Sequence, residues 1–211
     1  MREDYDEEFW EKHSVTRPAD PIAAVDGFER LLDTNPPESA IQSFLEDFPW
    51  ILSEQFPHCH FILPRFSMGG QYVTDFVAPE RSSGGTMWML IEIERSNCQL
   101  TTKTGDYAET VRHAIRQVKD WKRWLLDNQD LAARSRALGG LGLHDISRMV
   151  VGHVVVGRRS SVTPRFNLLR EETLQNDRIE VKTYDRLLDW ARKRAEFWAG
   201  YDRSCRSMFG K

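Results

Sequence analysis

The fold is decided by two neighbouring stretches of sequence, YVTDFV at residues 72–77 and MWMLIEIER at residues 87–95. Both are rich in β-branched and aromatic residues, which is typical of strands, and a turn signal of two serines and two glycines at residues 82–85 separates them. The second stretch is apolar on both faces until Glu92, as expected of a strand that is covered on both sides. The sequence therefore predicts a β-hairpin with carboxylates near its strand ends.

Two acids at the end of the second strand indicate the chemistry. Because side chains in a strand alternate with a period of two, Glu92 and Glu94 point to the same face, with Cα atoms about 6.6 Å apart. Two such carboxylates at a buried strand end repel each other and raise each other's pKa, which favours a cation between them. A hard divalent ion such as Mg²⁺ meets this need, with Asp75 on the neighbouring strand as a third oxygen donor. The alternative is that Glu92 and Glu94 pair with Arg or Lys where the strand meets solvent.

The composition is that of an ordinary globular chain. Its 211 residues are 40% hydrophobic and 29% charged, enough for one well-buried core. No apolar run is long enough to cross a membrane, and the first eight residues contain no hydrophobic signal region, so we expect a cytoplasmic protein without membrane contacts. With 29 basic and 32 acidic residues the net charge is −3, which excludes a polycation that coats nucleic acid. Any nucleic-acid binding must come from a local basic patch.

The chain is expected to divide into an acidic helical extension at residues 1–35 and one α/β domain at residues 36–211. In the extension, residues 22–32 have the spacing of a short amphipathic helix, and two prolines at 36 and 37 mark the linker. In the domain, helical and strand-like periodicities alternate, which predicts a mixed sheet. The expected helices lie at residues 38–47, 107–126, 167–175 and 185–199, and the expected strands at 61–66, 72–77, 87–95, 149–157 and 179–183.

Two polar side chains on the predicted helices are candidates for the same site. Gln117 falls at the edge of the apolar stripe of helix 107–126, where its amide can reach the strand ends; the alternative is a local hydrogen bond at the helix border. Glu38 lies on the inward side of helix 38–47. It is either a first-turn charge favoured by the helix dipole or a further acidic group near the site.

Five segments follow one another in an order that occurs in a known family: ESAIQSFLEDFPWIL at 38–52, TDF at 74–76, IEIE at 91–94, AIRQV at 114–118 and TYDRLL at 183–188. Over residues 36–195 the chain thereby resembles nucleases of the PD-(D/E)xK superfamily, and within it the Shedu-type anti-phage defence proteins. The resemblance implies a restriction-endonuclease-like core: a helix, a three-stranded antiparallel meander, a helix and further strands. A helical N-terminal extension and a C-terminal helix would complete this α/β fold.

The resemblance also implies an activity, that of a Mg²⁺- or Mn²⁺-dependent endodeoxyribonuclease in anti-phage defence. Asp75 and Glu92 would be the metal ligands, and Gln117 would support the site from its helix. One position departs from the family pattern, because Glu94 stands where the family has Lys. Some restriction enzymes of the superfamily carry Glu there and still cut. Lys103 is a candidate for the missing role, although its polar loop is also what a plain solvated lysine would occupy.

The mechanism that fits is in-line hydrolysis of a phosphodiester, with Glu94 accepting a proton or holding a second ion. Arg95, Lys103 and Arg158, near strand ends, are candidates to grip backbone phosphates of DNA. Two other functions are left open. A module of this fold that has lost catalysis would bind nucleic acid or a partner protein as a sensor, and a purely structural partner protein is the third reading. A homo-oligomer is compatible with each of them.

Overall fold

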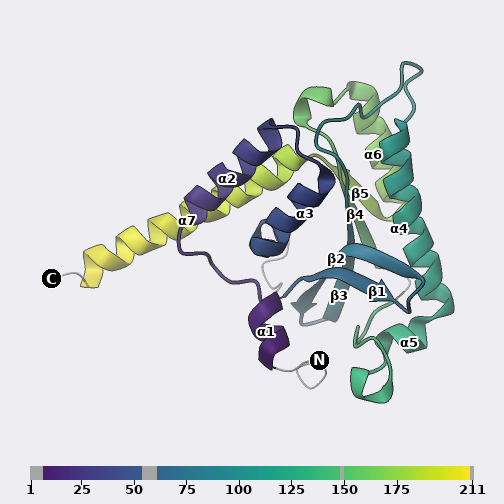
Figure 1. Ribbon diagram of the computed structural model, residues 1–211, viewed down its shortest axis with the longest axis horizontal. Coiled ribbons are helices and arrows are strands. Elements are labelled where there is room, and N and C mark those ends of the chain that lie inside the picture. Colours follow the sequence, from purple (N-terminus) through teal and green to yellow (C-terminus); the bar gives the residue numbers. More distant parts are fainter. Residues whose placement is uncertain (1–6, 54–60, 148–149, 210–211) are drawn as a thin grey trace.

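A single five-stranded mixed sheet organises the molecule (Figure 1). The computed structural model describes residues 7–53, 61–147 and 150–209, without the side chains of residues 82 and 202–209. The strands lie in the order β1-β2-β3-β4-β5; the first three are antiparallel neighbours, whereas β3, β4 and β5 run parallel. Their bounds are β1 (Leu63–Met68), β2 (Tyr72–Ser82), β3 (Gly85–Ile93), β4 (Val151–Val155) and β5 (Ile179–Lys182).

The predicted hairpin is confirmed. Strands β2 and β3 pair from Ser82 opposite Gly85 at the turn to Phe76 opposite Ile91. Gly85 has a φ of +109°, which a residue without Cβ adopts at little cost and which closes the turn. Strand β3 is the middle strand of the sheet, and its last six residues are all buried. The hairpin register thus carries the end of β3 toward the start of β2, where the acids lie.

Helices cover both faces of the sheet, with α2, α3 and α7 on one face and α4 and α6 on the other (Figure 1). The helices predicted in the domain are all present; α6 and α7 are longer than predicted, and α4 begins two residues later and ends one residue later than predicted. Residues 129–133 form a further short helix that the sequence pattern did not indicate. The bounds are α1 (Glu7–His13), α2 (Pro21–Asp33), α3 (Glu38–Asp47), α4 (Glu109–Asp127), α5 (Gln129–Ala133), α6 (Pro164–Asp177) and α7 (Tyr184–Phe209).

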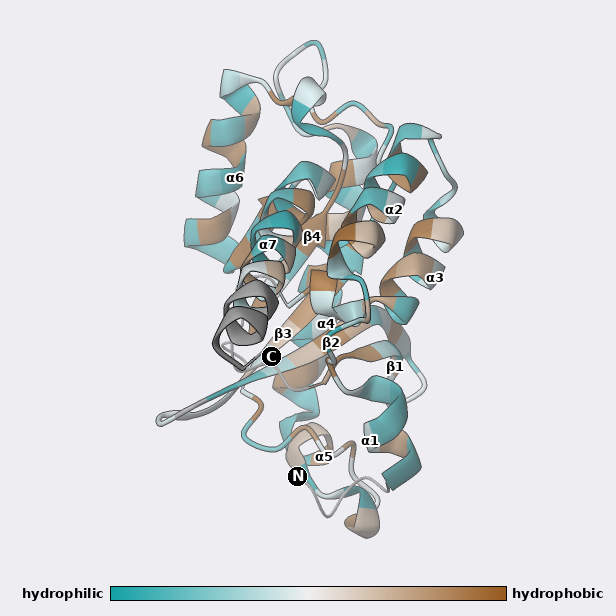
Figure 2. Ribbon diagram, turned by 90° about the vertical axis from the view of Figure 1, so that its left-hand side faces the viewer, coloured by the Kyte–Doolittle hydropathy of each residue, from teal (hydrophilic) through white to brown (hydrophobic). Residues whose placement is uncertain are grey.

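The core on the first face is built by α2, α3 and α7 against the sheet. Helix α2 starts at a well-defined cap, because the Asp20 carboxylate accepts the N–H of Ala23 and Pro21 occupies the first helical position. Its Phe28 is fully buried and meets Tyr184 of α7 edge to face. Part of the predicted acidic extension therefore packs into the same core as the domain. Figure 2 shows the apolar residues of these helices on the sides that meet one another.

The core on the second face is built by the apolar stripe of α4. Val118 and Trp121 are buried there, as the helical spacing predicted. Val118 can approach strand β4 closely because residue 152 is glycine; a Cβ at Gly152 would lie 2.4 Å from the Cγ1 of Val118. Helix α4 therefore lies directly over β3 and β4.

The longer bounds of α6 have a local cause. The Thr163 hydroxyl accepts the N–H of Phe166, and Pro164 takes the first helical position, so the helix begins before the predicted residue 167. None of the helices in the described ranges is long and apolar enough to cross a membrane.

Candidate active site

Two carboxyl groups from neighbouring strands are in contact at the centre of the site. The Asp75 and Glu92 side chains hydrogen-bond to each other, and Oδ2 of Asp75 also accepts the main-chain N–H of Ile93 at 2.8 Å. Burial, followed by the charge of Asp75, raises the pKa of Glu92 to about 10. Burial also raises the pKa of Asp75, against the hydrogen bonds from Ile93 and Glu92. The pair therefore keeps a proton at pH values where two separate carboxyl groups would both be ionised.

Two more acids adjoin this pair. Glu94 follows β3 and is fixed by its main-chain N–H, which donates to the carbonyl of Val155 at 2.9 Å. Glu38 begins α3, and its side chain hydrogen-bonds to that of Glu94. Burial and the charge of Glu38 raise the pKa of Glu94 to about 7, and burial and the charge of Asp75 raise the pKa of Glu38. The reading of Glu38 as a further acid of the site therefore agrees with the structure. We call Glu38, Asp75, Glu92 and Glu94 the acid cluster.

The polar residues around the acid cluster were missed at the sequence level. Gln42, buried on α3, donates to the main-chain carbonyl of Asp75 at 3.4 Å and to Glu46 at 2.9 Å. Arg65 of β1 bonds to the same Glu46 carboxylate at 3.0 Å, and its charge lowers the pKa of Asp75. His113 of α4 is near enough for its charge to lower the pKa of Glu38. Gln42 and His113 lie one turn from Glu38 and Gln117, a spacing that could have pointed to them.

Tyr184, the first residue of α7, anchors the main chain at the end of β3. Its ring is fully buried, and its hydroxyl donates to the main-chain carbonyl of Glu94 at 2.6 Å. Burial, and then the negative charges of Glu38, Asp75 and Glu94, keep the pKa of Tyr184 well above its ordinary value, so the hydroxyl stays a donor. Glu94 is thus fixed at its N–H by β4 and at its carbonyl by α7.

The acid cluster adjoins the surface at Glu38. A surface hollow of about 680 Å³ lies beside Glu38 and is lined by the α2–α3 connection and by the segment after β3. Arg95 lines this hollow, and its charge lowers the pKa of both Glu38 and Glu94. A polyanion entering this hollow would meet the Arg95 guanidinium beside Glu38. The lining residues are Asn35, Pro36, Pro37, Glu38, Ser39, Arg95 and Asn97.

The comparison with protein families decides the relationship. Residues 35–188, well over half of the chain, match the family described as Shedu protein SduA, C-terminal. The chain belongs to this Shedu family. Membership suggests a Shedu-type defence protein. No curated protein matches the chain.

The other predicted site residues of this Shedu-family chain lie outside the acid cluster. Gln117 is half-buried on α4, and within the described ranges it forms no hydrogen bond to any of the four acids. Lys103 is exposed in the loop between β3 and α4, and no described contact links it to the acids. The structure thus brings together Asp75, Glu92, Glu94 and Glu38, with Arg95 beside them. The roles of Gln117 and Lys103 stay predictions.

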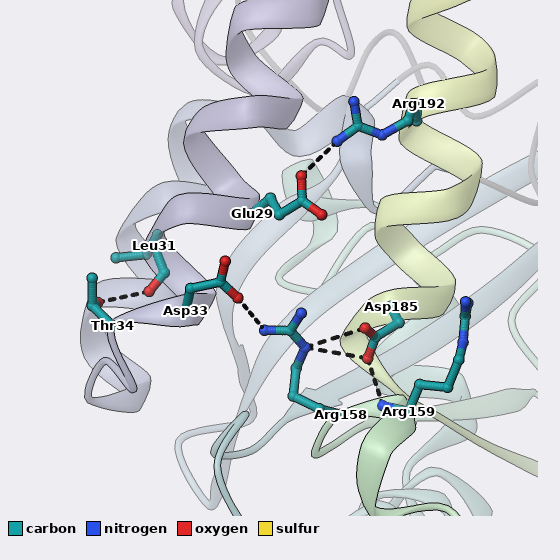
Figure 3. Close-up of polar contacts among 8 residues, drawn as sticks. All are labelled: Glu29, Leu31, Asp33, Thr34, Arg158, Arg159, Asp185 and Arg192. Carbon is teal, nitrogen blue, oxygen red and sulfur yellow. Dashed lines mark hydrogen bonds and ion pairs between the residues drawn. The ribbon is translucent and has the colours of Figure 1, made fainter.

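Arg158 has an intramolecular role that the sequence did not indicate (Figure 3). Its Nε bonds to the Asp185 carboxylate at 3.2 Å, and one terminal nitrogen bonds to Asp33 at 3.0 Å. The guanidinium therefore clamps the end of α2 to the start of α7. Both acids already neutralise the charge of Arg158. A DNA phosphate would therefore have to compete with two carboxylates for the guanidinium.

The donor set of the acid cluster limits how a metal could bind. Within the described ranges, no group of three or more His, Cys, Asp or Glu side chains is arranged to hold a metal ion. Asp75 and Glu92, however, hydrogen-bond through their side chains, and a cation bound to their oxygens would displace the proton that their raised pKa values favour. Mg²⁺ commonly takes one or two carboxylates and completes its shell with water. Two carboxylates fit such an ion in the Shedu-family chain, whereas a three-carboxylate cage does not.

Proposed function

We propose that this chain is a Mg²⁺- or Mn²⁺-dependent endonuclease that hydrolyses phosphodiester bonds of DNA in anti-phage defence. The observation that carries the proposal is the Asp75–Glu92 contact, in which two acids from adjacent strands meet in a buried place with two further acids beside them. Family membership supports the defence role. The five-stranded sheet and the order of the helices are compatible with a PD-(D/E)xK nuclease core.

A stabilising role would not produce this arrangement. Like charges that are buried together disfavour the ionised forms and leave the folded protein less stable at neutral pH than a neutral set would. Each acid is nonetheless fixed by main-chain or side-chain hydrogen bonds, so the arrangement is specified rather than accidental. An arrangement that is unfavourable alone but firmly held is typical of a site that binds a cation or handles protons.

Each residue of the site would have a separate role in the reaction. Asp75 and Glu92 would hold the metal ion, which when bound supplies polarisation of a phosphate oxygen and a more acidic water. Glu94, in the place of the family lysine, would accept a proton from the attacking water. Arg95, in the hollow beside Glu38, would bind a backbone phosphate and orient the strand. Gln117 would support the set from α4.

The test is cleavage of plasmid, linear duplex and single-stranded DNA with Mg²⁺ and with Mn²⁺. Glu94→Gln keeps the shape but removes the charge, and should lower the rate by roughly 10² to 10⁴, as expected for a lost general base. Asp75→Asn should lower it at least as far. Arg81→Gln, a change at an exposed residue on the far part of β2, serves as the control and should cut at the wild-type rate.

Equal cleavage by the wild type and both acid variants would mean a contaminating nuclease and would reject the proposal. One observation favours a second candidate, a module of this fold that binds nucleic acid without cutting it: a carboxylate stands in the lysine position, and Lys103 lies exposed in its loop. Binding of DNA without cleavage under every metal condition would support that candidate instead.

A further inference from the structure

The exposed aromatic side chains in the described part of the chain gather on one helix. Three aromatic residues are more than one-third exposed there, and all belong to α7: Trp190 at 36%, Phe197 at 70% and Tyr201 at 61%. Single exposed apolar residues are common on protein surfaces, but a set of aromatic residues on one element marks an interaction site. Figure 1 shows this part of α7 leading away from the sheet.

These aromatic side chains alternate with cations along one face of the helix. Arg186, Trp190, Lys193, Phe197 and Tyr201 all fall within an arc of about 80°, because consecutive helical residues are separated by about 100°. The row is about 22 Å long at 1.5 Å per residue. The guanidinium of Arg186 lies 5.6 Å, and the ammonium of Lys193 5.4 Å, from the centre of the Trp190 ring. We call these five residues the α7 row.

A basic hollow continues the α7 row at the start of the helix. This hollow, about 250 Å³, lies along the edge strand β5 between α6 and α7, and Arg186 lines it. Arg170 and Lys182 add two more cations, and Lys182 is only 4% exposed. Glu171 and Glu180 also line the hollow, and Glu180 lies 3.4 Å from Nζ of Lys182. Together with Lys193 the surface carries four cations and two acids, an excess of two positive charges.

We propose that the α7 row and the β5 hollow form a second nucleic-acid surface, which binds a single-stranded segment. Phosphates would lie at Arg186, Lys193 and the hollow, and unpaired bases would stack on Phe197 and Tyr201. Flat, exposed rings interleaved with cations are what a sequence-independent single-strand site requires, because every base presents a π-face and every nucleotide a charge. The α7 row lies on the face of the sheet opposite α4, and the hollow lies at the β5 edge, so binding there does not depend on the acid cluster being catalytic.

A second copy of the chain is a poorer occupant of this surface. Two α7 rows facing each other would bring Arg186 and Lys193 of one copy toward the same cations of the other, with an excess of positive charge on both sides. A polyanion instead gains from each of these charges. The surface excess of cations stands out because the whole chain has a net charge of −3.

The test measures fluorescence anisotropy of a fluorescein-labelled 20-nucleotide oligothymidylate with the full chain in EDTA, so that no metal bridges the strand to the acids. Phe197→Ala and Tyr201→Ala should each weaken binding about tenfold, the loss expected for one stacked base. Lys193→Gln should weaken it and reduce the log-log salt slope by about 0.7. Leu126→Ala, at a 54% exposed position on α4, and Arg81→Gln should bind as the wild type does.

Wild-type affinity in all three α7 variants would overturn the inference. Sedimentation velocity provides a second way to overturn it. If Phe197→Ala converts an oligomer to a monomer and leaves oligothymidylate binding unchanged, the α7 row joins copies of the chain. Asp75→Asn should bind the oligonucleotide normally in EDTA. Loss of cleavage in that variant together with unchanged binding in EDTA separates this surface from the proposed active site.

Discussion

Two carboxylates in the same sheet, Glu92 buried and Glu180 partly buried, have opposite environments. Glu92 of β3 faces Asp75, and its pKa is raised to about 10. Glu180 of β5 lies 3.2 Å from Nδ1 of His153 and 3.4 Å from Nζ of Lys182, and its pKa is lowered to about 2 by the bond to His153 and the charge of Lys182, despite burial. One acid meets an acid, whereas the other meets two bases.

The difference distinguishes an acid that can stabilise the fold from an acid pair that lacks a counter-charge within the protein. The ionised form of Glu180 is neutralised within the protein, so this group can contribute to folding stability. The ionised form of Glu92 has no such neutralisation, and burial makes the cost of its charge large. A divalent ion at Asp75 and Glu92 would give this site the counter-charge that Glu180 obtains from Lys182.

The largest effect should come from Glu180→Gln. It removes the carboxylate next to the buried Lys182, and breaking a buried ion pair costs about 3 to 5 kcal/mol. Because the Glu180 side chain is 29% exposed, we expect the lower end, about 3 kcal/mol, in urea unfolding at pH 7. Glu92→Gln is the matched control. It should raise the unfolding free energy, because at pH 7 the wild type must take up a proton at Glu92 when it folds and glutamine need not. Equal losses in both variants would contradict the contrast.

The second effect concerns pH and Glu94. The pKa of Glu94 is raised in the folded protein to about 7 from an ordinary value of 4.5, so the folded state binds this proton more tightly than the unfolded state does. Wild-type stability from this group is therefore present below pH 4.5 and lost as the pH rises to about 7. In EDTA, the unfolding free energy of Glu94→Gln relative to the wild type should rise by on the order of 2 kcal/mol between pH 4.5 and 7. At higher pH this difference should stay constant. A difference that does not change between pH 4.5 and 7 would show that Glu94 titrates normally.

The residues of this contrast differ in how far the sequence revealed them. Periodicity indicated the hairpin, the α4 stripe and the pairing of strands that brings Asp75 beside Glu92, because these depend on local pattern and register. It did not indicate Tyr184 or Gln42, since both act on main-chain carbonyls of residues far away in sequence. Nor did it indicate the contact between His153 and Glu180, which lie on neighbouring strands.

Arg158 shows that the sequence does not identify the partner of a charged side chain. A cation at a strand end has the pattern of a phosphate ligand, but two acids from α2 and α7 approach it only after the chain has folded. Charge in a sequence gives no information about its partner when the partner is more than a hundred residues away. The sequence likewise gave no sign that the exposed rings of α7 would lie in one row with Lys193 until the burial of the opposite side of α7 was known.

The third effect is stabilisation by metal. Mn²⁺ at ten times its dissociation constant should stabilise the wild type by about 1.4 kcal/mol, because only the folded chain brings Asp75 to Glu92. The melting temperature should rise in thermal scans at pH 7.5, and Asp75→Asn should abolish the rise. Glu180→Gln, although less stable, should retain the full metal-dependent increase. An increase that persists in Asp75→Asn would place the ion elsewhere, and no increase in the wild type would remove the counter-charge argument for this pair.

The smallest effect separates two arginines that the sequence treated alike. Arg158→Gln breaks partly exposed ion pairs with Asp33 and Asp185, so it should lower the unfolding free energy by about 1 kcal/mol and leave the salt dependence of DNA binding unchanged. Arg95→Gln should do the reverse, because Arg95 is exposed at the hollow beside Glu38. It should leave stability nearly unchanged and reduce the log-log salt slope on duplex DNA by about 0.9, the value for one lost phosphate contact.

Anisotropy titrations with a labelled duplex in EDTA at several salt concentrations measure the slope, and urea unfolding of the same preparations measures the stability. If Arg158→Gln reduces the slope and Arg95→Gln does not, DNA approaches the clamp between α2 and α7, and the acid cluster is not the group that the strand reaches.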